Sequence, residues 1–439
     1  MLSKIKGGCS VGFFGLGRSN LSLLECLPLE KCKITLRCDR EIDKNDIPSG
    51  VKIDRIICGE DANKDIDEDI LFFSPSVKRD RVDFIKAKER GVTFSSDAEL
   101  FLEENKSPLY AITGSDGKST TATLTQLLLQ AEGKRSRLLG NIGEPMTKEL
   151  NSEADCFVLE LSSFMLEYAV PRSKAACITN ITPNHLDWHG SLEDYKKTKL
   201  NIAKIAERLI VSDDLADISG AYGIASISRK YKELKRISPA GIYITAEGGY
   251  ICRNGEKLIK ISDIRRREEH NIKNFMLAIA MTDGEVRADA IGKVASDFSG
   301  LRHRCELFLS KNGVDFIDSS IDSTPARTVQ TLKSLDRPVV IILGGRGKGL
   351  DYSLLLPALK KYARVAIITG ENAREIYGIV GNCVEAELCT SFEEAIFLGY
   401  DKAKEVGALL LSPASTSYDS FKNFEERGDK FREVLQKMH

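Results

Sequence analysis

The stretch Leu109-Tyr-Ala-Ile-Thr-Gly-Ser-Asp-Gly-Lys-Ser-Thr120 runs from an apolar strand into a polar loop with two glycines, and a helix-forming run over residues 120–132 follows. Backbone amides in such a loop can bind phosphate groups, and the N-terminus of the next helix adds further N–H donors. The lysine would reach the β and γ phosphates of a nucleotide, and a hydroxyl of Ser119 or Thr120 could bind Mg²⁺. The stretch therefore predicts a nucleotide-binding α/β domain.

This loop departs from the full GxxxxGK[ST] pattern, because Ile112 stands where the first glycine belongs. A chance Gly-Lys-Ser turn is the alternative interpretation. The further glycine, Gly114, and the strand–loop–helix order favour phosphate binding over that alternative.

Short apolar strands alternate with helical patterns on both sides of the loop, which is typical of parallel sheets with crossover helices. Hairpin signals at Gly248-Gly249 and Asn254-Gly255 predict a small antiparallel patch over residues 241–261, and Asn312-Gly313 predicts another hairpin. At 439 residues the chain fits about three domains, which we expect at 1–96, 97–300 and 301–439. The expected strands are Ser10–Phe14, Lys33–Leu36, Arg55–Ile57, Ile70–Phe73, Val92–Phe94, Leu109–Thr113, Cys156–Leu161, Ala176–Asn180, Val339–Leu343, Val365–Thr369 and Ala408–Ser412.

The composition narrows the class of protein. The chain has 63 Lys plus Arg against 64 Asp plus Glu, so a basic nucleic-acid-binding surface is not expected. Its apolar runs are far shorter than the ~20 residues that span a bilayer, and no membrane segment is expected. The eleven cysteines include no CxxC pair, which argues against a zinc framework or a secreted disulfide scaffold. A cytoplasmic protein is the best interpretation.

A second glycine-containing loop, Gly12-Phe-Phe-Gly-Leu-Gly-Arg-Ser-Asn20, also lies between a strand and a helical pattern. Its glycines would let the backbone approach a phosphate, and Asp39 at the end of the next strand is placed to bind a ribose. A tight turn without a ligand is about equally compatible with this loop alone.

Three further residues are candidates for metal or phosphate chemistry. Glu160 ends an apolar strand, where ligands bind in α/β sheets, although a strand-end glutamate is usually just solvated. His185 and His189 suggest a transition-metal site, but Pro183 and the absence of a third nearby histidine disfavour it. Lys199 lies on an amphipathic helix, where a solvated lysine is the ordinary expectation.

Taken together, the motifs resemble those of the ATP-dependent Mur ligases of peptidoglycan synthesis. The resemblance covers nearly the whole chain, and its C-terminal run is most similar to the D-glutamate-adding branch. The motifs are TGSDGKST, LELSSF, NITPNHLDWHGSLEDYKKTK, His270-Asn-Ile-Lys-Asn274, Leu301-Arg-His-Arg-Cys-Glu306 and Ser412-Pro-Ala-Ser-Thr-Ser-Tyr-Asp-Ser-Phe-Lys-Asn-Phe-Glu-Glu-Arg-Gly428.

The resemblance implies an N-terminal Rossmann-like domain for a UDP group, a central P-loop ATPase-type domain and a C-terminal Rossmann-like domain for an amino acid. It implies that ATP converts the carboxylate of UDP-MurNAc-L-Ala into an acyl phosphate, which the amine of D-glutamate attacks. Two Mg²⁺ ions and a carbamylated Lys199 are implied as well. The protein is expected to act as a monomer, without nucleic acid or membrane.

The resemblance also assigns roles to matching positions. Lys118, Glu160, His185 and Lys199 would be catalytic, and Ser119, Glu160, His185 and Lys199 would serve the metal ions. The ATP contacts would be Gly114, Ser115, Asp116, Gly117, Lys118, Ser119, Thr120, Asn271, Asn274 and Arg304. The UDP-substrate contacts would be Arg18, Ser19, Asp39, Ser74, Asn141 and Ser162. The D-glutamate contacts would be Ser323, Lys348, Ser417 and Phe424.

Three departures from the family pattern stand out. Ser319-Ser320-Ile321 replaces the commoner Asp-Ser-Lys, Gly347 replaces an aspartate, and Asn20 replaces the third glycine of the first loop. The alternatives are a sister ligase that adds another residue, a folylpolyglutamate synthetase, or a catalytically silent relative that only binds UDP-linked precursors. The first loop and the C-terminal run favour D-glutamate addition, and the retained Lys118, Glu160, His185 and Lys199 disfavour a silent relative.

Overall fold

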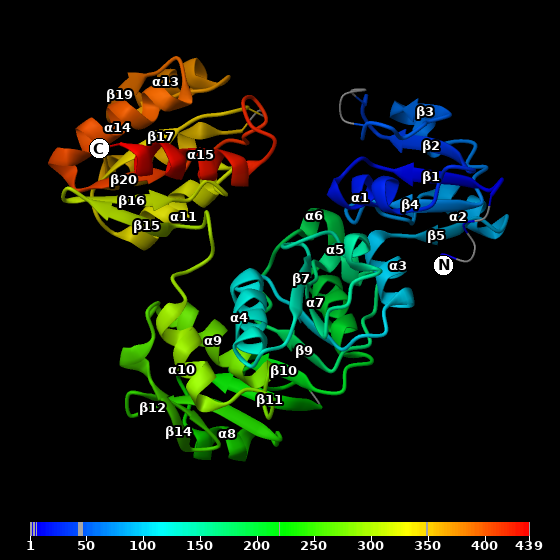
Figure 1. Cartoon of the computed structure of the whole chain (residues 1–439), viewed down its shortest axis with the longest axis horizontal. Coiled ribbons are helices and arrows are strands. Elements are labelled where there is room, and N and C mark those ends of the chain that lie inside the picture. The colour runs from blue at the N-terminus through cyan, green and yellow to red at the C-terminus, as the bar shows by residue number, and fades with distance from the viewer. Residues whose placement is uncertain are drawn as a thin grey trace. The chain divides into compact units, whose positions relative to one another are not determined.

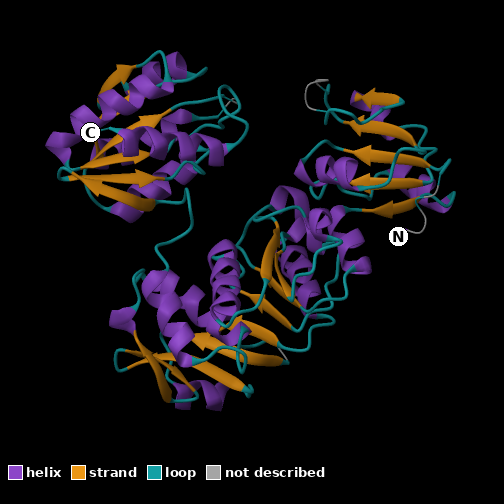
Figure 2. Ribbon diagram, viewed as in Figure 1, coloured by secondary structure: helices purple, strands orange, loops and turns teal. Residues whose placement is uncertain are grey.

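A computed structural model describes residues 2, 5, 7–42, 47–218, 220–347 and 350–438 (Figure 1). The chain divides into two compact units, Met1–Phe298 and Ser299–His439. Within the described residues there are three sheets, each flanked by helices (Figure 2). The predicted α/β class is therefore confirmed, whereas the division into three functional domains stays a prediction.

The first sheet has the strand order β3-β2-β1-β4-β5, and neighbouring strands are parallel. Apolar residues on both faces explain this arrangement, because helices cover a parallel sheet on both sides. The strands are β1 Ser10–Phe14, β2 Lys33–Cys38, β3 Arg55–Cys58, β4 Ile70–Phe73 and β5 Thr93–Ser95. The helices are α1 Arg18–Cys26, α2 Val82–Glu89 and α3 Asp97–Glu104.

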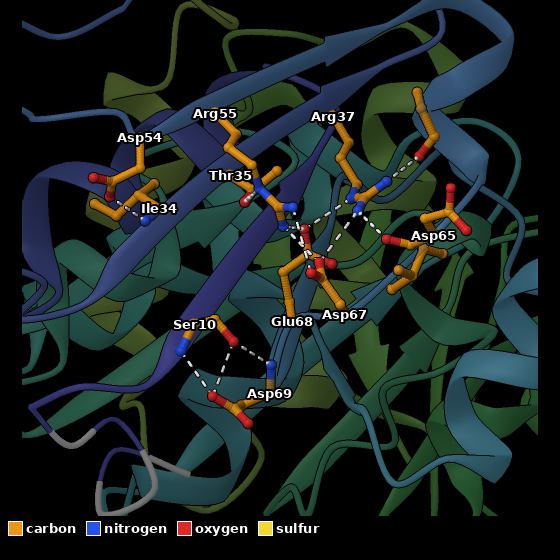
Figure 3. A network of polar contacts seen from close by, with 12 residues as sticks. Ser10, Ile34, Thr35, Arg37, Asp54, Arg55, Asp65, Asp67, Glu68 and Asp69 are labelled. Atoms are coloured by element: carbon orange, nitrogen blue, oxygen red, sulfur yellow. Dashed lines mark hydrogen bonds and ion pairs between the residues drawn. The ribbon is translucent and has the colours of Figure 1, made fainter.

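A buried ion pair holds the segment before β4 against this sheet (Figure 3). Arg37 on β2 is fully buried; its Nε donates to Glu68 Oε1 at 2.9 Å and its other nitrogens donate to the carbonyls of Ala62, Lys64 and Asp65. The guanidinium thus replaces backbone partners that this irregular connection lacks.

The central sheet has the order β14-β13-β12-β11-β10-β9-β6-β8-β7. Neighbouring strands are parallel from β7 to β12, and the β12–β13 and β13–β14 pairs are antiparallel and form the predicted patch. The strands are β6 Leu109–Thr113, β7 Ser136–Gly140, β8 Cys156–Glu160, β9 Ala175–Ile178, β10 Leu209–Ser212, β11 Ala221–Ser226, β12 Ile242–Glu247, β13 Tyr250–Arg253 and β14 Glu256–Lys260.

Helices cover both faces of the central sheet. One apolar core joins it to α4 Lys118–Ala131, α9 Glu269–Met281 and α10 Ala288–Asp297. A second core, on the opposite face, includes α3, α5 Ser163–Leu166 and α8 Tyr231–Ile237. The short helices α6 Leu186–His189 and α7 Leu192–Leu200 follow β9.

The sheet of the second unit has the order β15-β16-β20-β17-β18-β19, with the predicted hairpin as its antiparallel edge. Two cores pack it against helices, one with α11, α12 and α13 and the other with α14 and α15. The strands are β15 Glu306–Lys311, β16 Val314–Asp318, β17 Val339–Leu343, β18 Ala363–Ile368, β19 Glu385–Leu388 and β20 Ala408–Leu411. The helices are α11 Pro325–Leu335, α12 Leu356–Tyr362, α13 Ala373–Val380, α14 Phe392–Val406 and α15 Phe424–Lys437. Among the described residues, no helix is both long and apolar enough to cross a membrane.

A cluster of charges closes the amino-terminal edge of the central sheet. Glu285 forms ion pairs with Lys134, with Lys174 at 2.8 Å and with Arg208 at 3.1 Å, and it accepts a hydrogen bond from Tyr110 at 2.7 Å. Burial alone would raise the pKa of Glu285, but its bonds to Lys134, Lys174 and Tyr110 lower that pKa to about 2. The Glu285 side chain is 11% exposed, so water screens these charges only weakly.

We expect Glu285→Gln to lower the free energy of unfolding at pH 7 by about 1–3 kcal/mol, because three cations would lose their carboxylate. A carboxyl with a lowered folded-state pKa stabilises above its ordinary pKa, so the difference from wild type should shrink as pH falls from about 4 to 2. Urea unfolding at several pH values measures this difference. Glu153→Gln is the matched control, since the Glu153 side chain is 93% exposed; an equal loss in both variants would contradict the assignment.

Candidate active site

The loop between β6 and α4 has a backbone that only glycine fits at two positions. Gly114 has φ +147°, and a Cβ there would collide with the Thr179 side chain. Gly117 has φ +76°, and a Cβ there would collide with the Asn274 amide. These glycines let the loop turn tightly into the N-terminus of α4, whose first amides have no helical partners. The predicted phosphate-binding loop therefore has the strand–loop–helix geometry that such binding needs.

Residues after β9 hold the same loop from its other side. The backbone N–H of Asp116 donates to Asn180 Oδ1 at 2.9 Å. Ser115 Oγ donates to the Thr182 carbonyl at 2.9 Å and lies 3.1 Å from the Tyr195 hydroxyl. The predicted ATP contacts Ser115 and Asp116 thus also shape the loop, while Ser119 and Thr120 are buried in the first turn of α4.

Two lysines converge on this loop. Lys118 Nζ donates to the carbonyls of Gly114 at 3.0 Å and Ser115 at 2.8 Å. Lys199 Nζ, from α7, donates to the same Gly114 carbonyl at 2.7 Å and to Thr113 Oγ1 at 3.3 Å. Two ammonium groups at one carbonyl make the region strongly positive and suited to an anionic ligand.

Lys199 is buried, with 1% of its surface exposed, so the solvated alternative is wrong. Burial, followed by the charge of Lys118, lowers the pKa of Lys199 to about 7, although Glu160 and Asp116 act in the opposite direction. A substantial fraction of Lys199 is then a neutral amine near neutral pH. Neutral amines are nucleophiles, whereas ammonium groups are not.

Glu160 at the end of β8 is fully buried rather than solvated. Its Oε1 accepts a hydrogen bond from Asn141 Nδ2 at 2.7 Å. Its Oε2 is buried and, within the described part of the chain, has no hydrogen-bond partner. A buried carboxylate oxygen without a partner is costly, and a cation would satisfy it.

The donors at this edge of the sheet fit Mg²⁺. A carboxylate oxygen of Glu160 and the hydroxyl of Ser119 are hard oxygen donors, which Mg²⁺ prefers. In the residues that the structure describes, no group of three or more His, Cys, Asp or Glu side chains is arranged to hold a metal ion. Mg²⁺ commonly binds proteins through one or two carboxylates and takes its other ligands from phosphates and water.

Other predicted residues of the first unit lie around this loop or on its flanks. Asn274 contacts the loop and lies 3.4 Å from Thr121 Oγ1, whereas the Asn271 amide bonds to Glu268 on its own helix. His185 precedes α6 with φ +52° and packs its ring against Phe164. Burial, then the nearby charges of Lys199 and Lys118, lowers the pKa of His185 against the opposing effect of Asp187.

The first loop has its own polar residues at the carboxyl ends of β1, β2 and β4. Ser74 Oγ donates to the Gly15 carbonyl at 3.2 Å, and Asp39 forms an ion pair with Arg81 at 2.8 Å. Ser19 lies in the first turn of α1. Asn20, the departure at the third glycine, is buried and its amide donates to the Phe14 and Gly15 carbonyls at 3.0 and 2.7 Å. Asn20 therefore anchors the loop that a third glycine would only have allowed to pack closely.

The loop over residues 140–143 contacts both the first glycine-containing loop and Glu160 at the end of β8. Arg18 from the first loop donates to the Gly143 carbonyl, and Asn141 holds Glu160 as described above. Ser162, also predicted at the substrate, caps α5 by accepting from the Met165 N–H at 3.2 Å. Of the predicted UDP-substrate contacts, Asn141 is thus the one that bonds directly to the Glu160 carboxylate.

In the second unit, several predicted D-glutamate contacts belong to one set of loops at the carboxyl ends of β16 and β20. Ser417 is buried, and its carbonyl accepts from the Phe421 N–H at 2.9 Å. The Phe424 carbonyl accepts from Ser320 Oγ at 2.8 Å. Ser323 is half-buried in the loop after β16. Lys348 lies outside the described residues, and Arg304 lies before β15 in this unit.

Arg427, at the start of α15, also contacts this set of loops. It is part of the C-terminal motif, but the sequence alone assigned no role to it. It is 2% exposed and donates to Ser320 Oγ at 3.0 Å, to the Ser320 carbonyl at 2.8 Å and to the Ser415 carbonyl at 3.1 Å. Burial lowers the pKa of Arg427 to about 10, against the nearby carboxylates. This buried arginine ties two loops to α15 and so helps to fix the positions of Ser417 and Phe424. Its place in the same short motif as these two residues is the sequence feature that could have identified it.

Comparison with known proteins places the chain in a family. The family model of the Mur ligase middle domain matches residues 112–282. The UDP-N-acetylmuramoylalanine--D-glutamate ligase of Acetivibrio thermocellus is 37% identical over 385 residues, which cover 84% of this chain and 82% of the relative. The enzyme of the same name from Clostridium kluyveri is 31% identical over 444 residues, covering 98% and 96%.

Solved structures give the same fold at lower identity. The UDP-N-acetylmuramate-alanine ligase of Thermotoga maritima aligns with a TM-score of 0.58 and 17% identity, covering 98% of this chain and 99% of that one. The folylpolyglutamate synthase of Thermotoga maritima aligns with a TM-score of 0.53 and 13% identity, covering 78% and 93%. The likeness to these two structures concerns the fold alone. The relatives above 30% identity and the matching middle domain show that the chain belongs to the Mur ligase family, in the branch of the UDP-N-acetylmuramoylalanine--D-glutamate ligases.

Proposed function

We propose that the chain is an ATP-dependent ligase (EC 6.3.2.9) that joins D-glutamate to UDP-N-acetylmuramoyl-L-alanine in peptidoglycan precursor synthesis. The observation that supports it best is the convergence of Lys118 and Lys199 on a glycine-shaped loop beside the buried Glu160. Lys118 and a row of helix amides can bind a triphosphate, and a carboxylate can bind its metal ion. The family to which the chain belongs supplies the substrate pair.

The reaction joins a carboxylate to an amine, and a carboxylate resists attack by a nucleophile. ATP transfers its γ-phosphoryl group to the carboxylate of the precursor, and the resulting acyl phosphate has a good leaving group. The amine of D-glutamate attacks the acyl carbon, and inorganic phosphate leaves. Lys118 and the loop amides would hold the phosphates in line, so that most of the catalysis is positioning and charge neutralisation.

Bound Mg²⁺ would neutralise charge on the phosphate oxygens. Ser119 and Glu160 would hold one ion, and the unpartnered Glu160 Oε2 is the atom that supports this assignment. His185 and Lys199 would serve a second ion. Lys199 could do so only as a carbamate, because CO₂ adds to a neutral amine and turns a cation into an anion. Its burial and lowered pKa favour that modification.

Roles for the two other sheets follow from the same proposal. Arg18, Ser19, Asp39 and Ser74 would bind the UDP group, with Asn141 and Ser162 next to the muramoyl peptide. Asn271, Asn274 and Arg304 would contact ATP. Ser323, Lys348, Ser417 and Phe424 would bind D-glutamate, where one cation and two hydroxyls suit a dicarboxylate.

The proposal also sets the compartment and the assembly. ATP and nucleotide-linked sugars are compounds of the cytoplasm, where we place the enzyme. The proposed site residues lie on a single chain, so a monomer can act alone.

The first prediction concerns the amino acid. We expect phosphate release from ATP and Mg²⁺ with UDP-N-acetylmuramoyl-L-alanine and D-glutamate, and at least about tenfold less with L-glutamate, L-lysine or meso-diaminopimelate. A coupled phosphate assay with each amino acid at equal concentration measures this selectivity. The absence of release with D-glutamate would contradict the proposed function, and faster release with another amino acid would favour a sister ligase.

The second prediction concerns Lys118. We expect Lys118→Ala to lower kcat by about 10²–10³-fold, because a cation at the developing phosphate charge is lost. Lys148→Ala is the matched control, since Lys148 is an exposed lysine of the same unit, 3.3 Å from Glu144. Unchanged kcat in Lys118→Ala would remove this lysine from the mechanism.

The third prediction concerns Lys199. We expect Lys199→Ala to lose activity and to regain part of it with a short-chain carboxylic acid, which would replace the carbamate. Lys197→Ala, an exposed lysine on the same helix, should remain active. In ¹³C-bicarbonate, wild type should show a carbamate carbon resonance that Lys199→Ala lacks. The same spectrum for both proteins would exclude carbamylation of Lys199, whatever the activity.

A further inference from the structure

Two cysteines of the first sheet have their sulfur atoms in contact, far along the strands from the glycine-containing loop. Cys9 Sγ and Cys32 Sγ are 3.1 Å apart. Cys9 precedes β1 and Cys32 precedes β2. An S–S bond measures about 2.05 Å, so the two sulfurs need to approach by only about 1 Å to form a disulfide.

The backbone already holds both residues in register. β1 and β2 are parallel with Ser10 opposite Lys33, which places Cys9 opposite Cys32. The Gly8 N–H donates to the Lys31 carbonyl at 2.8 Å, and the Lys33 N–H donates to the Cys9 carbonyl at 2.9 Å. Hydrogen bonds on either side of the pair therefore fix the distance between the two neighbouring strands. A disulfide requires such a fixed, short distance.

A second anchor fixes the Cys9 side of the pair (Figure 3). Ser10 donates to Asp69 Oδ2 through its backbone N–H at 2.7 Å and its hydroxyl at 2.9 Å, and the Asp69 N–H donates back to Ser10 Oγ at 3.0 Å. These three bonds tie the start of β1 to the segment before β4. The backbone beside Cys9 is thus held in place next to Cys32.

Both cysteines are half-buried and border cavities at the protein surface. Cys9 lines a cavity of about 610 Å³, and Cys32 lines a different cavity of about 1030 Å³. A hydroperoxide is small enough to enter either of them. A small oxidant can therefore reach the pair, and the two sulfur atoms already lie close enough together to form a disulfide after a small movement.

We propose that Cys9 and Cys32 are a redox-modification site, at which a hydroperoxide drives formation of a disulfide that clasps the starts of β1 and β2 together. The Cys9 sulfur attacks the hydroperoxide and is oxidised to a sulfenic acid, and the O–O bond breaks to release water or an alcohol, which carries away the thiol proton. The Cys32 thiol then attacks the sulfenic sulfur, and water leaves with the Cys32 proton. A dithiol reductant reverses the modification.

The surroundings of Cys32 set the order of these two steps. Burial, followed by the hydrogen bond and charge of Cys9 and the charge of Glu30, raises the pKa of Cys32. Cys32 therefore holds its proton more firmly than an ordinary thiol. Cys9 is then the sulfur that meets the oxidant, and Cys32 resolves the sulfenic acid.

The expected consequence is a more stable first sheet. A Cys9–Cys32 bond encloses β1, the first glycine-containing loop and α1 in one covalent ring, which restricts the unfolded chain. The modification lies at the amino ends of the strands, whereas Gly15 and Ser74 lie at their carboxyl ends. It therefore stabilises the sheet without reaching the residues proposed to bind UDP.

Peptide mapping of the full chain tests the pair directly. After brief hydrogen peroxide and alkylation of the remaining thiols, trypsin should yield a linked pair of peptides, residues 7–18 joined to residues 32–33, lighter by about 2 Da than the two free thiols. Cys26 falls on the separate peptide 19–31. Dithiothreitol should abolish the linked species, and Cys9→Ser and Cys32→Ser should never form it.

Thermal melting supplies the second measurement. Oxidised wild type and the matched control Cys26→Ser should melt about 5 °C higher than their reduced forms, while Cys9→Ser should not change. Cys38 and Cys58 are also register partners, on β2 and β3, and their tryptic peptides are 38–40 and 56–64. A link between those peptides in place of the predicted one, over-oxidised Cys9 beside reduced Cys32, or a linked protein that melts no higher would overturn the proposal.

Discussion

The buried carboxylate of Glu160 is the constraint around which the first unit is organised. A buried carboxyl group needs partners, and among the described residues only one of its oxygens has a hydrogen-bond partner, the Asn141 amide. Lys199, at the neighbouring loop, lies close enough to interact electrostatically with the Glu160 carboxylate. Glu160 and the loop before α4 belong to adjacent strands, so their separation is set by the β6–β8 pairing and not by flexible side chains. A site built in this way is positioned by the sheet itself.

The same electrostatics explain how a chain with almost no net charge can bind very anionic substrates. Lys118 and Lys199 are placed at one carbonyl, and Lys199 is kept out of water. Their repulsion is part of the reason why Lys199 gives up its proton easily. The positive field is local, because many other lysines and arginines are paired with carboxylates, as Arg37 is with Glu68 inside the first sheet. A small net charge is thus compatible with strong phosphate binding.

Much of the fold could be predicted from sequence, since its strands are short apolar runs between turn signals. β1, β4, β6 and β17 begin and end where expected. The strands that were missed, β7, β10, β11 and β19, include polar or small residues such as Arg137 and Gly223, and their pairing with neighbours decides their structure.

The glycine-containing loop was recognisable because its residues are contiguous. The burial of Lys199 could not be predicted from the sequence. A lysine on an amphipathic helix is expected to be solvated, and only tertiary packing buries this one. Arg427 and the Cys9–Cys32 contact depend on register and loop closure, which no local pattern contains.

The hydrogen bond from Arg18 to Gly143 links two sites thermodynamically. The Gly143 loop also carries Asn141, whose amide determines where the Glu160 carboxylate lies. A ligand that draws the Arg18 guanidinium to itself changes the free energy of that loop. By reciprocity, whatever tightens Asn141 on Glu160 changes the affinity for that ligand by the same factor. A change at the first glycine-containing loop and a change at the Glu160 carboxylate would therefore affect each other through one short loop.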